Sequence, residues 1–265
     1  MARFAGSHLF RGALSLLAVA ALATPAALAE APAGHDLAPI DGGARRFAID
    51  RFEVTIGQFR RFVAATGRVT RAEREGGGFQ YRAGWERMSG WSWRAPYGKP
   101  GHDDEPAVHV TWHEAKAYCA WAGLRLPSDA EWLLAAYTER RTQPPPPFVW
   151  DRRYRFPTGE TADGANHIEA PPKAVDGWRL PVPVTALGQG RGHVPVRRTA
   201  PGVNGLWDMG ANVWEWVDHD VAGRKRTRGG SWWYGTAQMQ ADALYEKPAD
   251  FPAVYIGFRC ARSRN

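Results

Sequence analysis

The density of glycine, proline and tryptophan sets the strongest limit on how this chain can fold. The 265 residues include 29 Gly, 20 Pro and 13 Trp. Gly and Pro interrupt regular elements, whereas each Trp buries a large apolar area. We therefore expect many turns and short elements that are held in place by aromatic side chains. The apolar share of 44% and the charged share of 23% are typical of a soluble globular protein and exclude a disordered chain, collagen or a multi-span membrane protein.

The first 29 residues have the pattern of an export signal. Arg3 and Arg11 supply a positive start, residues 12–23 are apolar, and residues 27–29 form a small-residue cleavage site. A membrane anchor is the alternative, but the apolar run meets Pro25 before it reaches the roughly 20 residues that a bilayer requires. We predict cleavage and a periplasmic or secreted protein without a membrane span.

The rest of the chain is predicted to form one domain. We expect a flexible segment over residues 30–39 and a single domain over residues 40–265, because no internal repeat and no linker divides it. The formal net charge is +7, but the arginines are scattered and no nucleic-acid motif is present. We therefore predict a solvated surface and no nucleic-acid partner, with an acidic partner or a negatively charged envelope surface as the alternative.

Cys119 and Cys260 are the two cysteines of the chain. Thiols outside the cytoplasm tend to be oxidised, so the compartment favours a structural disulfide between them. A bridge that closes a loop of roughly 140 residues would stabilise the fold by about 4 to 5 kcal/mol in the loop-entropy estimate. A redox or metal-binding cysteine pair is the alternative, but the sequence has no CxxC motif.

Three segments begin with a Ser or Thr that is followed three residues later by Glu or Gln, which is the capping-box pattern of a helix start. With the apolar spacing that follows, they predict helices over 55–67, 111–123 and 128–136. Short strands are predicted over 47–54, 107–110, 226–233 and 256–261. Residues 142–203 are mostly turn residues, and we expect ordered irregular structure there, held by Trp150, Trp178 and metal ions.

Eight sequence blocks occur together along most of the chain and in one order. They are Glu53-Val54-Thr55, Val110-Thr111-Trp112, Arg125 to Trp132, Ala165-Asn166, Gly205 to Met209, Asn212 to Trp216, Arg228 to Trp232 and Gly257 to Cys260. On these blocks the chain resembles the formylglycine-generating enzyme family, also called the sulfatase-modifying factor family. The resemblance implies an atypical C-type-lectin-like α/β domain, of the α+β kind with much irregular structure. It also supports a bridge between Cys119 and Cys260.

The same resemblance implies two calcium sites made of oxygen ligands, which are the donors that Ca²⁺ takes. The first would use Asn166, the His167 carbonyl, Asp176 and the Trp178 carbonyl, and the second Asp208, the Ala211 and Val213 carbonyls and Glu215. The alternative is a set of Asx-turns and hydrogen-bonded carboxylates without metal. At residues 210–211 this chain has Gly then Ala where the family usually has Ala then Gly, which alters one carbonyl donor.

The chain departs from the family after Gly229-Gly230-Ser231. In the enzymes that make formylglycine, cysteines three and eight residues after this Ser bind Cu(I) and activate oxygen. Tyr234 and Met239 stand at those positions here. Soft Cu(I) prefers thiolates, and neither a phenol nor a single thioether replaces two of them. We therefore predict that this chain does not generate formylglycine, and no other redox metal is assigned.

Two functions remain open. The first is an exported oxidative maturation or tailoring factor that acts on a peptide, a protein or a small aromatic substrate. Its predicted groove is lined by Ser231, Trp233, Tyr234, Met239 and Tyr245, with Lys247 or Glu246 as the charged partner. The second is a non-catalytic lectin-like binding module or accessory protein that uses the same surface, because Trp and Tyr dominate binding energetics.

The segment His102-Asp103-Asp104-Glu105, with His109 and His113, contains residue types that bind zinc. Thr111 caps a helix between the two later histidines, so they do not share one helical face. We favour a solvated loop over a metal centre here.

Overall fold

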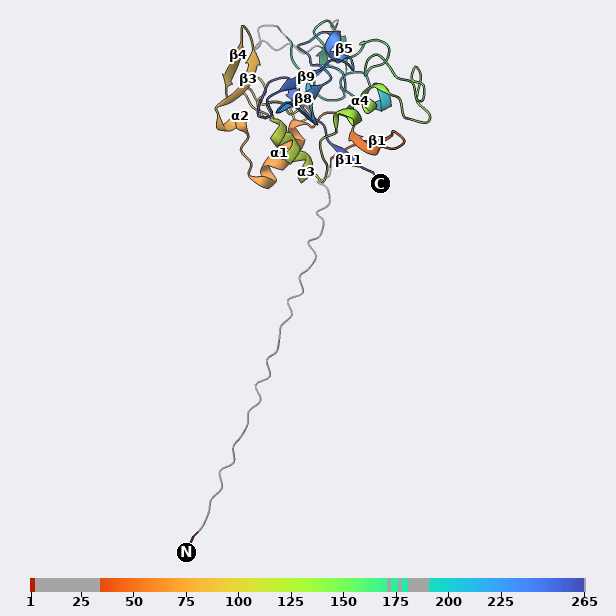
Figure 1. Ribbon diagram of the computed structural model, residues 1–265. Helices are drawn as coiled ribbons and strands as arrows, with labels where there is room; N and C mark the ends of the chain where they lie inside the picture. Colours follow the sequence, from red (N-terminus) through yellow and green to blue (C-terminus); the bar gives the residue numbers. More distant parts are fainter. Residues whose placement is uncertain (3–33, 171–172, 176–177, 181–190, 265) are drawn as a thin grey trace. The chain divides into compact units, whose positions relative to one another are not determined.

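A computed structural model describes residues 1–2, 34–170, 173–175, 178–180 and 191–264 (Figure 1). Contacts divide the chain into the units Met1–Glu30 and Ala31–Asn265, and every element below belongs to the second unit. Most of the predicted export signal and Asp176 lie outside the described residues. None of the helices in the described ranges is long and apolar enough to cross a bilayer.

The three predicted helices are present as α1 (Ile56–Thr66), α3 (Trp112–Trp121) and α4 (Asp129–Tyr137). Each has a complete capping box, in which the N-cap hydroxyl and the side chain three residues later satisfy each other's backbone N–H groups. Gly67 ends α1 with a left-handed φ of 65°, as its position in the sequence suggested. A fourth, short helix, α2 (Arg71–Arg74), begins with the same chemistry at Thr70 and was not predicted.

Within the described ranges, the strands form four small sheets. Sheet one has the order β1-β2-β11 and sheet two the order β10-β7-β8-β9, while β3-β4 and β5-β6 are hairpin pairs. The strands are β1 (Leu37–Asp41), β2 (Arg46–Asp50), β3 (Gly77–Tyr81), β4 (Trp85–Ser89), β5 (Lys173–Val175), β6 (Trp178–Leu180), β7 (Trp214–Val221), β8 (Arg224–Arg228), β9 (Tyr245–Lys247), β10 (Ile256–Gly257) and β11 (Ala261–Ser263). Short 3-10 turns cover Val203–Gly205 and Thr236–Met239.

The strand predictions need three corrections. Residues 107–110 form no strand, because their backbone N–H groups bond to scattered carbonyls, such as Ala107 to Val54 and His109 to Ala253. The strand predicted over 226–233 ends at Arg228, where two glycines turn the chain, and the one over 256–261 is split into β10 and β11. The first strand begins at Leu37, so ordered structure starts before residue 40.

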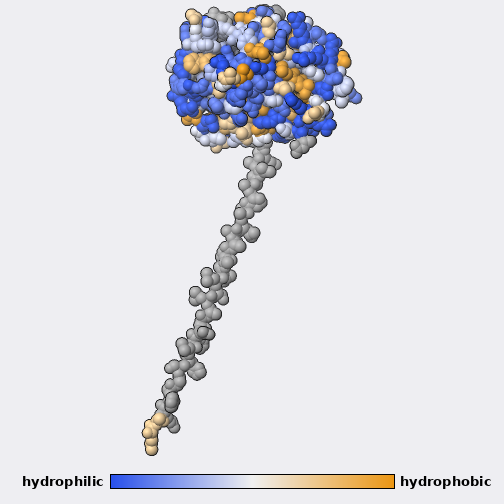
Figure 2. Space-filling view, viewed as in Figure 1, coloured by the Kyte–Doolittle hydropathy of each residue, from blue (hydrophilic) through white to orange (hydrophobic). Residues whose placement is uncertain are grey.

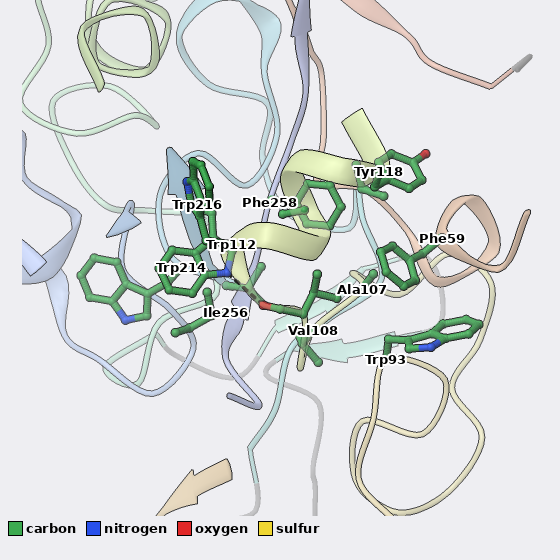
Figure 3. Close-up of a cluster of buried hydrophobic side chains, with 14 of the residues drawn as sticks. Phe59, Trp93, Ala107, Val108, Trp112, Tyr118, Trp214, Trp216, Ile256 and Phe258 are labelled. Atoms are coloured by element: carbon green, nitrogen blue, oxygen red, sulfur yellow. Dashed lines mark hydrogen bonds between the residues drawn. The ribbon is translucent and has the colours of Figure 1, made fainter. Parts of the chain in front are cut away.

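The main core lies between α1, α3 and the second sheet (Figure 3). Tyr118 of α3 packs between Phe59 of α1 and Phe258, with ring centroids 5.7 and 5.4 Å apart. Trp112 and Trp216 donate their indole N–H groups to the Val217 and Val110 carbonyls at 3.0 and 2.9 Å. Large aromatic side chains therefore hold the short elements together, as the composition suggested.

The disulfide between Cys119 and Cys260 is confirmed. It joins the buried face of α3 to the residue that precedes β11, with the two Cα atoms 5.6 Å apart. Both side chains are fully buried in the main core. On the molecular surface, hydrophilic residues cover most of the face shown in Figure 2, with small hydrophobic areas among them.

Candidate functional site

The chain reaches the candidate site through Gly229 and Gly230, which follow β8 with φ angles of 96° and 82°. A Cβ on Gly229 would lie 2.7 Å from the Met209 carbonyl oxygen, so only glycine fits this turn. The turn buries Ser231 and Trp232 and brings Tyr234 partly to the surface.

Tyr234 packs against three aromatic rings, two of which lie on strands of the second sheet. Its ring centroid lies 5.4 Å from that of Trp214 on β7, 5.8 Å from Tyr255 and 6.3 Å from Tyr245 on β9. Trp214 and Tyr245 are themselves 4.8 Å apart. Two of the predicted groove residues, Tyr234 and Tyr245, are therefore neighbours.

The β3-β4 hairpin extends this set of rings. Trp85 on β4 lies 5.9 Å from Tyr255, 4.6 Å from Phe251 and 5.3 Å from Tyr81. Tyr81 and Trp85 are 43% and 41% exposed, which is unusual for aromatic side chains that already have partners. We call the seven residues the aromatic cluster. Its members are Tyr81, Trp85, Trp214, Tyr234, Tyr245, Phe251 and Tyr255.

Lys247 is the cation at this cluster. Its Nζ lies 5.4 Å from the centroid of the Trp85 ring, and no ion pair of Lys247 occurs within the described part of the chain. Burial lowers the pKa of its ammonium. Glu246, the other predicted charged partner, is occupied, because Arg226 donates to its carboxylate at 2.8 Å. Lys247 is therefore the residue that can attract an acidic group to these rings.

Two buried polar groups beside Tyr234 interact with its hydroxyl group. They are the indole Nε1–H of Trp214 and the hydroxyl of Tyr255, and both side chains are 1% exposed. Buried polar groups are normally paired. Both groups are therefore paired with Tyr234, and their contacts oppose the rise in the pKa of its phenol that burial causes.

The structure does not bring all predicted groove residues together. Met239 is fully buried in a separate small cluster, where it packs with Phe156, Ala165 and Ala211. Ser231 is also fully buried, and Trp233 packs on Trp232 with centroids 5.1 Å apart. The placement of Met239 in the groove is therefore wrong, since its side chain fills a gap beneath Gly210.

The residues at the two family cysteine positions do not fit a Cu(I) site. Burial raises the pKa of the Tyr234 phenol, so it carries its proton at neutral pH and offers no anionic ligand. The Met239 thioether lies in a different cluster, and both cysteines are bound in the disulfide. The chain thus lacks the paired soft ligands that the metal requires.

A buried charge cluster occupies the region of the second predicted calcium site. Glu215 accepts from Arg259 Nε and Nη2, both at 2.7 Å, and from Trp132 Nε1 at 2.8 Å. Asp208 accepts from the Thr199 hydroxyl at 2.6 Å, and burial raises its pKa to about 6. Hydrogen-bond donors therefore already surround both carboxylates that the prediction assigned to calcium.

Glu53 adds a third carboxyl group to this charge cluster. It is fully buried, and burial together with the charges of Asp208 and Glu215 raises its pKa well above the ordinary value. One oxygen accepts from Asn212 at 3.1 Å, while Oε2 has no partner among the described residues. The surroundings of this carboxyl group therefore favour its protonated form.

The first predicted calcium site contains one side-chain oxygen that could bind a metal ion. Asn166 is 2% exposed, and its Nδ2 donates to the Gly192 carbonyl and to Asn212, both at 3.1 Å. Its Oδ1 has no partner within the described residues. This oxygen fits a hard cation. Asp176 and the side chain of Trp178 lie outside what the structure describes.

Among the predicted zinc-type residues, Glu105 has a specific partner that the sequence did not suggest. His193 Nε2 lies 2.8 Å from Glu105 Oε2, and His193 Nδ1 lies 2.8 Å from the Tyr97 hydroxyl. His109 is also buried and packs against Gly78, whereas His113 is exposed on α3. In the described ranges, no three or more His, Cys, Asp or Glu residues are grouped so that they could hold a metal.

Comparison with known proteins identifies relatives over nearly the whole second unit. A family model described as the sulfatase-modifying factor enzyme 1-like domain matches residues 31–264. The chain is 34% identical over 196 residues to the formylglycine-generating enzyme of Thermomonospora curvata, an alignment that covers 64% of this chain and 58% of that enzyme. The chain therefore spans less than two thirds of that relative's length.

Two further similarities extend this comparison. The chain is 31% identical over 280 residues to the inactive C-alpha-formylglycine-generating enzyme 2 of Mus musculus, covering 88% of this chain and 81% of that protein. The structure of PvdO from Pseudomonas aeruginosa is similar with a TM-score of 0.55 and 21% identity, covering 87% of this chain and 92% of that one. That likeness supports the expected lectin-like fold.

Proposed function

Because this chain belongs to the sulfatase-modifying factor family, we propose that it is an oxidative maturation or tailoring factor. Its substrate would be an exported peptide, protein or peptide-derived product with an aromatic side chain. The reaction would proceed without the cysteine-pair copper chemistry of the formylglycine-generating relatives. Its setting would be the periplasm or the cell exterior, after removal of the first 29 residues.

The aromatic cluster is the single observation that carries this proposal. Exposed aromatic side chains give large contact areas at low entropic cost, and they dominate many binding surfaces. Tyr245 and Tyr255 flank the position at which the family places its first catalytic cysteine, here Tyr234, and Trp85 packs against Tyr255. Lys247 supplies the charge that would select a substrate with a nearby carboxylate.

Calcium is part of the proposal as a structural ion. The unpartnered Asn166 Oδ1 is the observation in its favour. The ion would bind at the first predicted site and would order the turn-rich segment that follows, without taking part in the chemistry.

A second candidate function is a non-catalytic binding module that uses the same aromatic cluster. The specific observation in its favour is that Tyr234 and Met239 provide no pair of metal ligands. The extensive similarity to a relative described as inactive points the same way.

One experiment separates the two functions. The purified protein is titrated calorimetrically with a short tyrosine-containing peptide that ends in a free carboxylate, and with the same peptide as a C-terminal amide. Trp85→Ala and Tyr245→Ala should weaken binding about tenfold or more, whereas Trp150→Ala, which removes a 53% exposed Trp outside the cluster, should not. Lys247→Gln should weaken binding of the peptide with a free carboxylate and leave binding of the amide peptide unchanged.

Mass spectrometry of the peptide after incubation with dioxygen and added copper or iron then decides the class. If the peptide is oxidised and Trp85→Ala abolishes this oxidation, the protein is a maturation factor. If the peptide binds without a change in mass, the protein is a binding module. If no peptide binds, or if Trp150→Ala has the same effect, both fail. A sulfatase-motif cysteine peptide in the same assay should keep its thiol, because no pair of soft ligands is present.

A further inference from the structure

A cavity of about 650 Å³ lies on the first sheet, away from the residues of the aromatic cluster. The end of β1, the start of β2, the loop after α4 and Arg264, which follows β11, form its walls. Arg264 is fixed beside β2 because its backbone N–H bonds to the Arg46 carbonyl at 3.1 Å. The charged residues that line the cavity are Asp41, Arg46, Arg140, Arg141 and Arg264.

Four of these residues are arginines, and Asp41 is the only acidic residue that lines the cavity. Arg264 has no ion pair within the described part of the chain. Arg46 faces Asp41 at 3.5 Å, but the two side chains are 63% and 59% exposed, so their attraction is weak. Two of the four guanidinium groups are therefore available to an anion.

The other two arginines are held in place and still have donors to spare. Arg140 donates through Nε to the Asp41 carbonyl and through Nη1 to Asp151. Arg141 donates through Nε and Nη2 to Glu139 at 2.8 and 2.6 Å. Each guanidinium has five N–H donors, so Arg140 Nη2 and Arg141 Nη1 remain free to bond a ligand.

Asp41 limits which anions the cavity can bind. The Gly43 backbone N–H lowers the pKa of its carboxyl group, and the charges of Arg46 and Arg140 lower it further, so it stays ionised. A ligand with one negative charge gains little, because it must compete with this carboxylate. A ligand with several anionic groups can bond the fixed pair and the available pair together.

We propose that this cavity, which we call the arginine cavity, binds a small polyanion. The chemical class is a molecule with two or more phosphate or carboxylate groups. The site is independent of the proposed oxidative function and shares no residue with the aromatic cluster. A guanidinium group forms bidentate hydrogen bonds with phosphate and with carboxylate alike. The proposal therefore specifies the number of anionic groups on the ligand and not one compound.

The test is calorimetric titration of the purified protein with inorganic pyrophosphate and with citrate, at moderate salt. We expect saturable binding of one equivalent and about tenfold weaker binding for Arg46→Gln or Arg264→Gln. The control is Arg68→Gln, which removes an exposed arginine that packs over Phe62 and does not line the cavity. It should bind like the wild type.

Three outcomes would overturn the proposal. They are the absence of saturable binding, an equal loss in Arg68→Gln, and binding to vesicles of anionic phospholipid without binding of either free polyanion. Binding to both vesicles and pyrophosphate would support the cavity and would identify a lipid headgroup as one source of the anion. Thermal unfolding of each variant checks that it is folded, and the exposure of Arg46 makes that the expected result.

Discussion

Arg259 and Glu215 form an ion pair in which both guanidinium contacts are 2.7 Å long and the side chains are 0% and 1% exposed. The same guanidinium donates to the Asp50 and Trp207 carbonyls at 2.9 Å. One side chain thus connects the first sheet, β7 and the loop that carries Asp208.

The first prediction is that Glu215→Gln lowers the free energy of unfolding by about 3 to 5 kcal/mol. Removal of one partner leaves the other charge buried and uncompensated. Urea unfolding monitored by circular dichroism measures the change. Glu160→Gln breaks an ion pair with Arg152 whose side chains are 54% and 51% exposed, and it should leave the midpoint almost unchanged. Similar losses in the two variants would contradict a special role for the buried pair.

The second prediction concerns calcium. We expect added Ca²⁺ to raise the thermal unfolding temperature of the wild type, because an ion that binds only the folded state stabilises it. Asn166→Ala should remove this rise, since it deletes the free Oδ1, while Asn166→Asp keeps an oxygen ligand and should retain it. Scanning calorimetry in calcium and in chelator compares the three proteins. An equal calcium response in all three would assign the ion to another place or to none.

The third prediction is a loss of stability in acid that arises from His109. Burial lowers the pKa of its imidazole from 6.5 to about 4, so the folded protein binds this proton less readily than the unfolded chain. The stabilising contribution is complete above pH 6.5 and is lost as the pH falls toward 4, by roughly 3 kcal/mol. His193 contributes a like charge near His109, and Trp91, Gly78 and the carbonyls of Pro96 and Pro252 also surround the His109 ring.

Urea unfolding of His109→Asn between pH 7 and pH 4 tests this relation. Asn tolerates the φ of 56° at this position and does not titrate in this pH range. The free energy of unfolding of the variant should therefore fall by roughly 3 kcal/mol less than that of the wild type over the same change in pH. The exposed His113→Asn is the control and should follow the wild type. A pH profile of His109→Asn parallel to that of the wild type would refute the assignment.

The fourth prediction treats Met239 as a packing residue. Met239→Ala should lower the free energy of unfolding by about 2 to 5 kcal/mol, because it leaves a cavity beneath Gly210. Binding of the aromatic peptide should stay unchanged. Leu244→Ala, at a 56% exposed side chain, should have little effect on stability. A binding loss without a stability loss would return Met239 to the site.

The sequence predicted the helices well because their signals are local. A capping box and the apolar spacing after it lie within a dozen residues, as in α1 and α3. The same signal at Thr70 and Glu73 was overlooked, and it marks α2. The β3-β4 hairpin was missed because β4 is largely exposed and shows no apolar alternation.

Three of the eight residues of the candidate site, which are the aromatic cluster and Lys247, could be inferred from their position in the chain. Tyr234, Tyr245 and Lys247 follow the glycine pair and were predicted, but Trp85 joins them only through tertiary contacts. No spacing rule connects residues about 150 positions apart. Met239 was assigned to the groove by counting from Ser231, which gives no information on the direction of its side chain.

The disulfide determines how the chain would carry a mechanical load. When the two ends are pulled, tension passes directly from Cys119 to Cys260 through the covalent bond, so the residues between them bear none of it. Tyr234 and Tyr245 lie inside this shielded loop, whereas Trp85 on β4 lies in the stretched part. A chain tethered at both ends would therefore lose one wall of the aromatic cluster under force while the other wall stayed folded.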